Sequence, residues 1–131
     1  MLRSERGSVL VSGLLLTLAV LMILGAAVDV GHAVIVRRDL TSIADDAALA
    51  GAQQLDLNAI HQGRLALDPN QAQAAALSAL TPDRGLTAQA EATDTLVHVH
   101  VSRTFPTVLL RLVGLNDLTV SADANATPRA P

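Results

Sequence analysis

Two histidines on a predicted strand are the side chains in this 131-residue chain whose type and spacing come nearest to metal chemistry. His98 and His100 alternate with valines over residues 97–101, so a strand would place both imidazoles on one face, about 7 Å apart. Histidine and carboxylate side chains together form zinc sites. Three carboxylates are candidates for a third ligand: Glu91, Asp94 and Asp123. No motif places any of them, so the sequence favours the alternative, an exposed polar strand face.

Acidic side chains supply two further candidates, both in a predicted helix. Asp45 and Asp46 are adjacent, and adjacent helical residues point in different directions, so we expect a solvated helix face rather than a catalytic pair. Asp29 and His32 are one turn apart, close enough to touch on the helix surface. We interpret them as membrane-boundary residues. Either they make a charge contact with a partner helix, or both are solvated at the interface, where an ionisable group costs far less than at the bilayer centre.

Neither the motifs nor the charge balance points to catalysis or to nucleic acid. The sequence lacks a Gly-rich phosphate loop, a nucleophile elbow and a zinc motif. Nine basic against twelve acidic residues leave a formal net charge of −3, which argues against nucleic-acid binding. We therefore predict that the protein is not an enzyme and uses no cofactor, metal or small-molecule substrate.

The element that must position Asp29 and His32 is a long N-terminal helix. From Gly7 to Val28 the chain has 22 residues without a charge. At about 1.5 Å per residue this run spans roughly 33 Å as a helix, enough to cross a bilayer core of about 30 Å. The sequence therefore predicts a single membrane span over about residues 8–28, and the membrane as a partner.

The same N-terminus has features of a secretory signal peptide. Gly25–Ala27 offers small residues for cleavage, but a signal peptide has an apolar core of about 7–15 residues, and this run is longer. We predict a retained anchor. Arg3 and Arg6 before the run are balanced by Arg37 and Arg38 after it, so local positive charge does not fix the orientation. We expect the short N-terminus in the cytoplasm and the larger C-terminal part outside it.

The helical pattern continues beyond the apolar run. Nothing from Ser8 to about Gln54 breaks a helix. In its second half, small and apolar residues recur at spacings of three and four, which is typical of a seam that packs on a partner. The predicted helix-packing interface comprises Val36, Leu40, Ile43, Ala47, Ala50 and Gly51. This face packs either on the chain's own C-terminal part or on other subunits, and the sequence leaves both alternatives open.

The rest of the chain alternates between short helices and strands. Asp68 followed by Pro69 predicts a helix start, with Asp as N-cap and Pro at the first helical position. Strict alternation over 86–93 and 97–102 predicts a β-hairpin with one buried face. A short helix is expected over residues 106–114, which begin with Pro and end with Gly, and a last strand over 118–125.

These elements predict an α+β fold. A long N-terminal transmembrane helix continues into a small domain of helix and antiparallel sheet, and packing this sheet on the long helix covers every apolar face. We divide the chain into a tail with the long helix, residues 1–55, and a small α+β domain, residues 56–131, with a frayed C-terminal tail. Phe105 is the single aromatic residue and there is no cysteine, so the domain has a small-residue core without a disulfide and is marginally stable.

Three stretches resemble a known family. They are Arg6-Gly7-Ser8, the sequence Ala-Val-Asp-Val-Gly at 27–31, and Ala-Asp-Asp-Ala-Ala-Leu-Ala-Gly-Ala at 44–52. Together they resemble the TadE/TadG-like proteins of tight-adherence (Flp, type IVb) pilus systems. Residues 99–126 also resemble the C-terminal part of actinobacterial members. The resemblance implies a bitopic envelope protein with a pseudopilin-like shape. It would assist assembly or anchoring of a pilus, with other pilus-assembly or pseudopilin-like proteins as partners, rather than catalyse a reaction.

One position departs from the pattern of true pilins. Their prepilin peptidase signal has a Glu five residues after the cleaved Gly, and counting from Gly7 that position is Ser12, which argues against cleavage there. Two alternatives to a pilus role stay open. One is a secreted or membrane-tethered interaction domain without catalytic activity and unrelated to pili. The other is a small envelope enzyme or metal-binding protein that uses His98 and His100.

Overall fold

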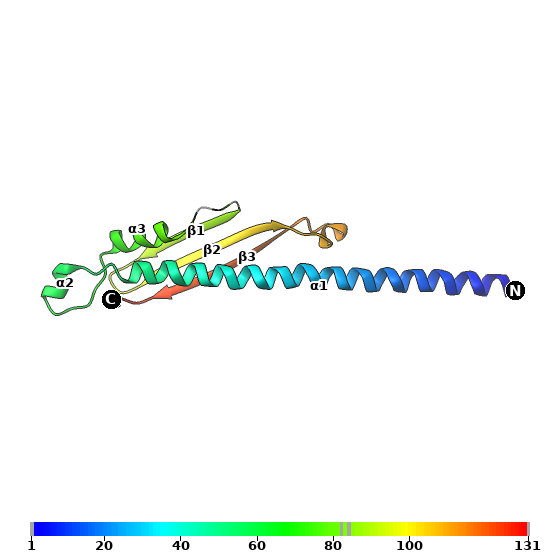
Figure 1. Cartoon of the computed structure of the whole chain (residues 1–131), viewed down its shortest axis with the longest axis horizontal. Helices are drawn as coiled ribbons and strands as arrows, with labels where there is room; N and C mark the ends of the chain where they lie inside the picture. Colours follow the sequence, from blue (N-terminus) through cyan, green and yellow to red (C-terminus); the bar gives the residue numbers. More distant parts are fainter. Residues whose placement is uncertain (1, 82, 84, 131) are drawn as a thin grey trace. The chain divides into compact units, whose positions relative to one another are not determined.

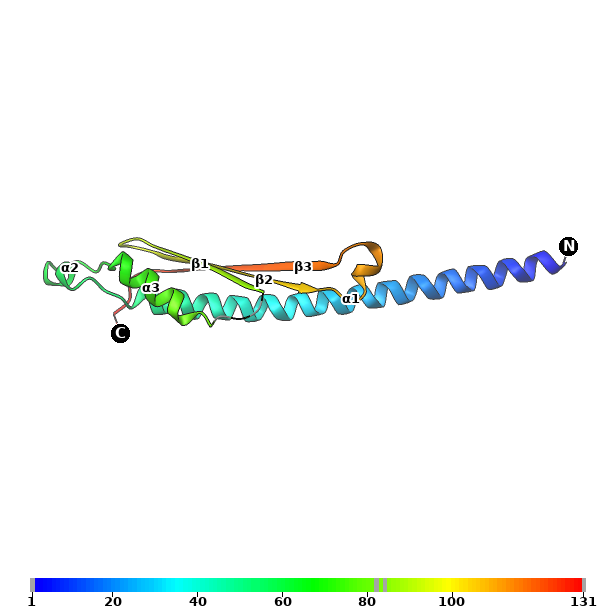
Figure 2. The ribbon, with the colours of Figure 1, turned by 90° about the horizontal axis from the view of Figure 1, so that it is seen from above.

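The computed structural model describes residues 2–81, 83 and 85–130. Its elements, in chain order, are α1 (Leu2–Ala52), α2 (Leu57–His61), α3 (Pro69–Ala79), β1 (Leu86–Ala92), β2 (Val97–Pro106), the 3-10 helix η1 (Leu110–Val113) and β3 (Asp117–Ala126). Figures 1 and 2 show them from two sides. The strands form one antiparallel sheet in the order β1-β2-β3. The predicted α+β fold, with a long N-terminal helix that is a candidate membrane span, is therefore confirmed.

Contacts divide the chain into two compact units whose boundary falls inside α1. The first unit, here the anchor unit, holds the chain up to Ala33 together with Pro106–Leu118. The second, here the sheet unit, holds Val34–Phe105 and the chain from Thr119 onward. The predicted division into residues 1–55 and 56–131 follows the order of the elements. The contacts group them differently, because the second half of α1 belongs to the core of the sheet.

The core of the sheet unit lies between one face of α1 and the inner face of the sheet. Every third or fourth residue of α1 from Val36 onward is buried, and most of these residues are alanines. Opposite them, the inward side chains of β2 are fully buried: Val97, Val99 and Val101. At Gly51 the helix lies close to both α3 and β2: a Cβ there would lie 2.9 Å from the Ala72 carbonyl oxygen and 3.0 Å from a Val97 methyl carbon. The small side chains of α1 therefore set its distance from the sheet.

The predicted hairpin and helix start are both present. β1 and β2 pair antiparallel with Ala90 opposite Val99, which puts the alternating apolar residues of both strands on the inner face. Asp68 caps α3 by accepting hydrogen bonds from the Asn70 and Gln71 backbone N–H groups at 3.1 and 3.2 Å. Pro69 is the first residue of this helix, as expected.

Three details differ from the sequence prediction. The helix α2 was not predicted, although Asp56 caps it by accepting from Asn58 N at 2.8 Å, the same chemistry that Asp68 uses. Pro106 ends strand β2 instead of opening a helix, and only a 3-10 turn follows, which Gly114 ends with φ of 92°. The C-terminal tail was expected to fray, but the Arg129 backbone N–H donates to the Ala52 carbonyl oxygen at 3.1 Å.

Gly51→Ala should lower the stability of the full chain. Replacing Gly by Ala gains at most about 0.5–1 kcal/mol at this position, the second-last of α1, but the added methyl overlaps the Ala72 carbonyl, and such overpacking costs about 1–3 kcal/mol. We expect a lower thermal midpoint by circular dichroism in detergent. Gly31→Ala is the matched control on the same helix, because its Cβ would meet nothing within 4 Å. Equal stabilisation by both substitutions would show that Gly51 does not lie at a close approach.

Candidate membrane-boundary site

The first part of α1 presents its apolar side chains outward. Among the described residues, α1 is the one helix long and apolar enough to cross a membrane, and it lies near the N-terminus. Its large side chains from Val9 to Leu24 are half or more exposed for the most part, Leu10 reaching 75%. Apolar side chains without protein cover over this length fit a single-pass membrane protein.

Asp29 stands at the end of this apolar run and is the centre of the anchor unit. Its residue is only 4% exposed, and its carboxylate accepts three backbone hydrogen bonds. Oδ1 accepts from Val108 N at 3.0 Å, and Oδ2 accepts from Leu109 N at 2.9 Å and from Leu110 N at 2.8 Å. Hydrogen bonds to an ionised acceptor are stronger than neutral ones. One side chain of α1 therefore fixes the start of a segment about 80 residues away in the sequence.

These hydrogen bonds also set the protonation state of Asp29. The N–H groups of Leu110 and Val108, and more weakly that of Leu109, hold the pKa of the Asp29 carboxyl below its ordinary value of 3.8. The positive charge of His32 lowers this pKa further, whereas removal from water raises it. Asp29 is therefore a carboxylate at neutral pH, and it is the charged form that binds the segment.

The segment that Asp29 holds folds back on itself, and we call residues Thr107–Asn116 the tethered loop. The Thr107 N–H donates to the Asn116 carbonyl at 3.0 Å, and the Thr107 hydroxyl donates to the carbonyls of Leu115 and Asn116. Within the loop, Leu109 packs directly on Gly25 of α1: a Cβ at Gly25 would lie 2.9 Å from the Cβ and Cγ of Leu109. Glycine leaves the space that this leucine occupies.

The two predicted membrane-boundary residues have different surroundings. Asp29 is covered by the chain's own loop, whose backbone N–H groups satisfy its carboxylate. His32 is exposed, and its influence on Asp29 is electrostatic. The sequence could not show the three N–H donors, because nothing in the residues Val108–Leu110 marks their backbone as the partner of a distant carboxylate. The position of both residues at a membrane boundary stays a prediction.

The predicted helix-packing face lies in the sheet unit. Four of its residues are buried in the core: Val36, Leu40, Ala47 and Gly51. Ile43 and Ala50 are half-buried at its edge. This face therefore packs on the chain's own sheet, which is one of the two alternatives. A contact between α1 and other subunits would have to use a different face of the helix, and it stays a prediction.

The two candidate histidines lie on the outer face of the sheet, as the strand pattern predicts. His100 Nδ1 lies 2.7 Å from Asp123 Oδ1, and His98 Nδ1 lies 2.7 Å from Asn125 Oδ1, so each histidine pairs with a residue of β3. Asp123 is the one candidate third ligand that comes close to both, with His98 Nε2 at 3.5 Å. Even so, within the described ranges no group of three His, Cys, Asp or Glu side chains is arranged to hold a metal ion. These contacts join two strands.

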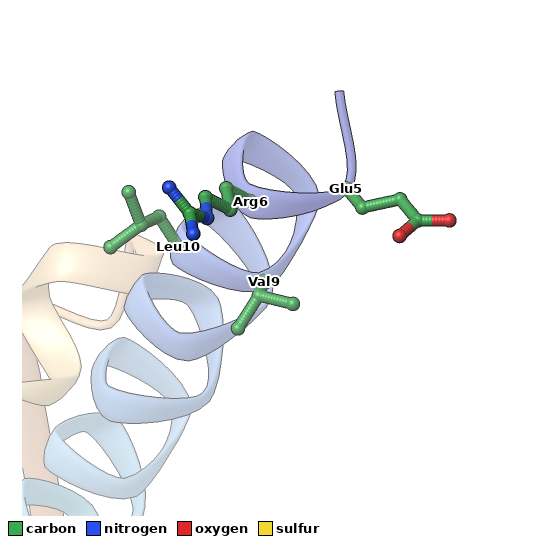
Figure 3. Close-up of a pocket in the computed structure, with 4 residues that line it drawn as sticks. All are labelled: Glu5, Arg6, Val9 and Leu10. Atoms are coloured by element: carbon green, nitrogen blue, oxygen red, sulfur yellow. The ribbon is translucent and has the colours of Figure 1, made fainter. Parts of the chain in front are cut away.

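Arg103 makes a contact that the sequence prediction missed. Its guanidinium lies between Asp39 of α1, at 3.3 Å, and Asp83, at 3.0 Å. Asp45 and Asp46, by contrast, are both exposed. A shallow hollow at the start of α1 offers no paired groups either: Figure 3 shows the Glu5 side chain pointing away from Arg6.

Residues 7–54 match a family model described as "Putative Flp pilus-assembly TadE/G-like". This segment, which begins near the start of the apolar run and ends just after α1, is thus similar to the TadE/G-like family, and the predicted resemblance is confirmed there. The match does not test the actinobacterial type. Comparisons with curated proteins and with solved structures gave no match.

The amide signals of the tethered loop should report the titration of Asp29. Because its folded pKa is lowered, the hydrogen bonds are present above pH 3.8 and are lost only as the pH falls through the lower, folded value. We expect the amide proton shifts of Val108, Leu109 and Leu110 to change together with a midpoint below 3.8. The measurement is a nuclear magnetic resonance titration of the full chain in detergent, with Asp29→Asn as the control that shows no such change. A shared midpoint above 3.8 would contradict the geometry.

Proposed function

Starting from the TadE/TadG-like segment, we propose that this chain is a single-pass membrane component that assists the assembly or anchoring of a Flp/Tad-type pilus. The observation that carries the proposal is the coincidence of this segment, residues 7–54, with one structural element. It takes in the uncharged run, Asp29 and the small-residue face that packs on the sheet. A pilus-assembly role calls for an anchored protein, and the exposed apolar run of α1 supports such an anchor.

A retained anchor is part of the proposal. Cleavage near Ala27 would remove Gly25 and leave the Leu109 side chain without the helix surface on which it packs. Cleavage after Gly7 would keep both residues but would require a peptidase to accept Ser12 where true pilins carry Glu. The contact between Gly25 and Leu109 therefore supports a mature protein that keeps its apolar helix.

The proposed orientation places the short N-terminus in the cytoplasm and the C-terminal domain outside the cell membrane. The sheet, α2 and α3 all follow the apolar run in the sequence, so they would cross the membrane together. Partners would be other pilus-assembly or pseudopilin-like proteins. The exposed side of α1 in the sheet unit offers apolar side chains for such contacts, among them Ile35 and Leu49.

Deleting the chromosomal copy should abolish piliation, and the full chain supplied in trans should restore it. Normal pili in the deletion strain would refute the pilus role and favour the membrane-tethered interaction domain.

Immunoblots should find the protein in the membrane fraction after alkaline carbonate extraction, because the apolar helix holds it there. A soluble mature form that begins near Val28 would refute the anchor.

Single cysteines can test the orientation, because the chain has no cysteine of its own. Ser121→Cys on β3 should react with a membrane-impermeant maleimide in cells whose outer layers have been permeabilised, whereas Glu5→Cys should react only after the inner membrane is opened. Both positions are exposed, so accessibility to solvent is matched. The reverse labelling pattern would invert the proposed orientation.

A further inference from the structure

The tethered loop exposes apolar side chains to an unusual degree. Between Pro106 and Asn116 the chain has one ionised residue, Arg111. Four apolar side chains of this short segment are more than half exposed, up to 68% for Leu112: Val108, Leu112, Val113 and Leu115. Single exposed apolar residues are ordinary on a protein surface, but a cluster of this kind marks a contact with something apolar.

The exposed cluster is continuous with the apolar surface of the predicted membrane span. Leu109 and Leu112 line an apolar groove together with side chains of α1 from Leu18 to Val28. From Leu18 to Val28 the helix rises by about 15 Å, so the groove extends along the C-terminal half of the predicted span. The loop thus lies beside apolar side chains of α1 that stay largely exposed, among them Leu21, Leu24 and Val28.

Several backbone N–H groups of the tethered loop have hydrogen-bond acceptors within the protein, as a medium poor in water requires. Asp29 satisfies the N–H groups of Val108, Leu109 and Leu110. Further along, Leu112 N donates to Leu109 O, Gly114 N to Arg111 O and Leu115 N to Leu110 O, at 3.0–3.1 Å. Irregular backbone is tolerated next to lipid only where such groups find partners within the protein.

We propose that the tethered loop is a second membrane contact of the chain, which enters the boundary between lipid headgroups and acyl chains on the C-terminal side of the span. Lipid acyl chains fill the groove beside α1, and the Arg111 guanidinium binds lipid phosphate. This rests on the proposed membrane anchoring of α1. Leu112, Val113 and Leu115 take the place of the apolar face of an interfacial helix, which lies about 5–10 Å deep at this boundary.

Lipid is the occupant that the exposure pattern favours over a second protein helix. The span is exposed on all sides from Val9 to Leu24, and the apolar side chains of the loop extend this surface. A partner helix in the groove would cover only the groove, whereas lipid would also cover the apolar side chains that point away from the groove. The single charge of the loop is basic, which suits phosphate groups at the membrane surface.

The test uses the full chain in phosphatidylcholine–phosphatidylglycerol vesicles with single cysteines that carry an environment-sensitive nitrobenzoxadiazole label. Leu112→Cys and Val113→Cys report on the loop, Leu16→Cys on the middle of the span, and Ser121→Cys on an exposed strand position. We expect lipids with a nitroxide near the headgroup to quench both loop labels several-fold more strongly than the Ser121 label. Aqueous iodide should quench the Ser121 label several-fold more strongly than the loop labels.

Each other outcome overturns the proposal in a distinct way. If iodide quenches the loop labels as strongly as the Ser121 label while deep nitroxide lipids quench the Leu16 label, the loop lies in water and only the second contact fails. If the Leu16 label is not quenched by lipid, the anchor and the loop contact fail together. If the loop labels are shielded from iodide without lipid quenching, and lose this shielding when the protein is diluted in excess lipid, a second copy covers the groove instead.

Discussion

The hydrogen bonds between the Asp29 carboxylate and the backbone of Val108–Leu110 are the interaction on which the anchor unit depends. An ionised side chain at the end of an apolar helix is costly unless it is solvated or paired, and here three N–H groups take the place of water. The same three groups open an irregular loop that would otherwise leave them without partners beside an apolar helix. The carboxylate and the three N–H groups therefore provide one another with the hydrogen-bond partners that both need.

In the sheet unit the decisive constraint is the small size of the side chains that pack between α1 and the sheet. Alanines of α1 and the valines of β2 fill the core, and the structure gains stability from the closeness of helix and sheet rather than from large side chains. A core of this kind buries little area for each residue, so it tolerates few added methyl groups. The stability of the unit is thus tied to the helix that the TadE/G-like segment provides, which makes the domain after α1 dependent on α1.

Local chemistry made much of the fold predictable. The Asp68 cap and the alternation in β1 and β2 follow from rules that act over a few residues, and both were confirmed. Val36 and Leu40, which the helical spacing marks, lie in the core. The sequence could not reveal pairings across long separations, such as Asp29 with the tethered loop or His100 with Asp123. Asp29 was predicted to be a boundary residue from its place after the apolar run, but its hydrogen-bond partners depend on how the chain folds back toward α1. The helix α2 was missed, although the Asp56 cap was readable.

The central claim is that the Asp29 carboxylate holds the tethered loop on α1, and amide hydrogen exchange of the full chain in lipid nanodiscs tests it most directly. The account predicts slow exchange at Val108, Leu109 and Leu110 in the unaltered protein and fast exchange at the same amides in Asp29→Ala. Asp46→Ala, which removes an exposed carboxylate from the same helix, should leave them slow. Unprotected amides at these three residues in the unaltered protein, or unchanged protection in Asp29→Ala, would contradict it.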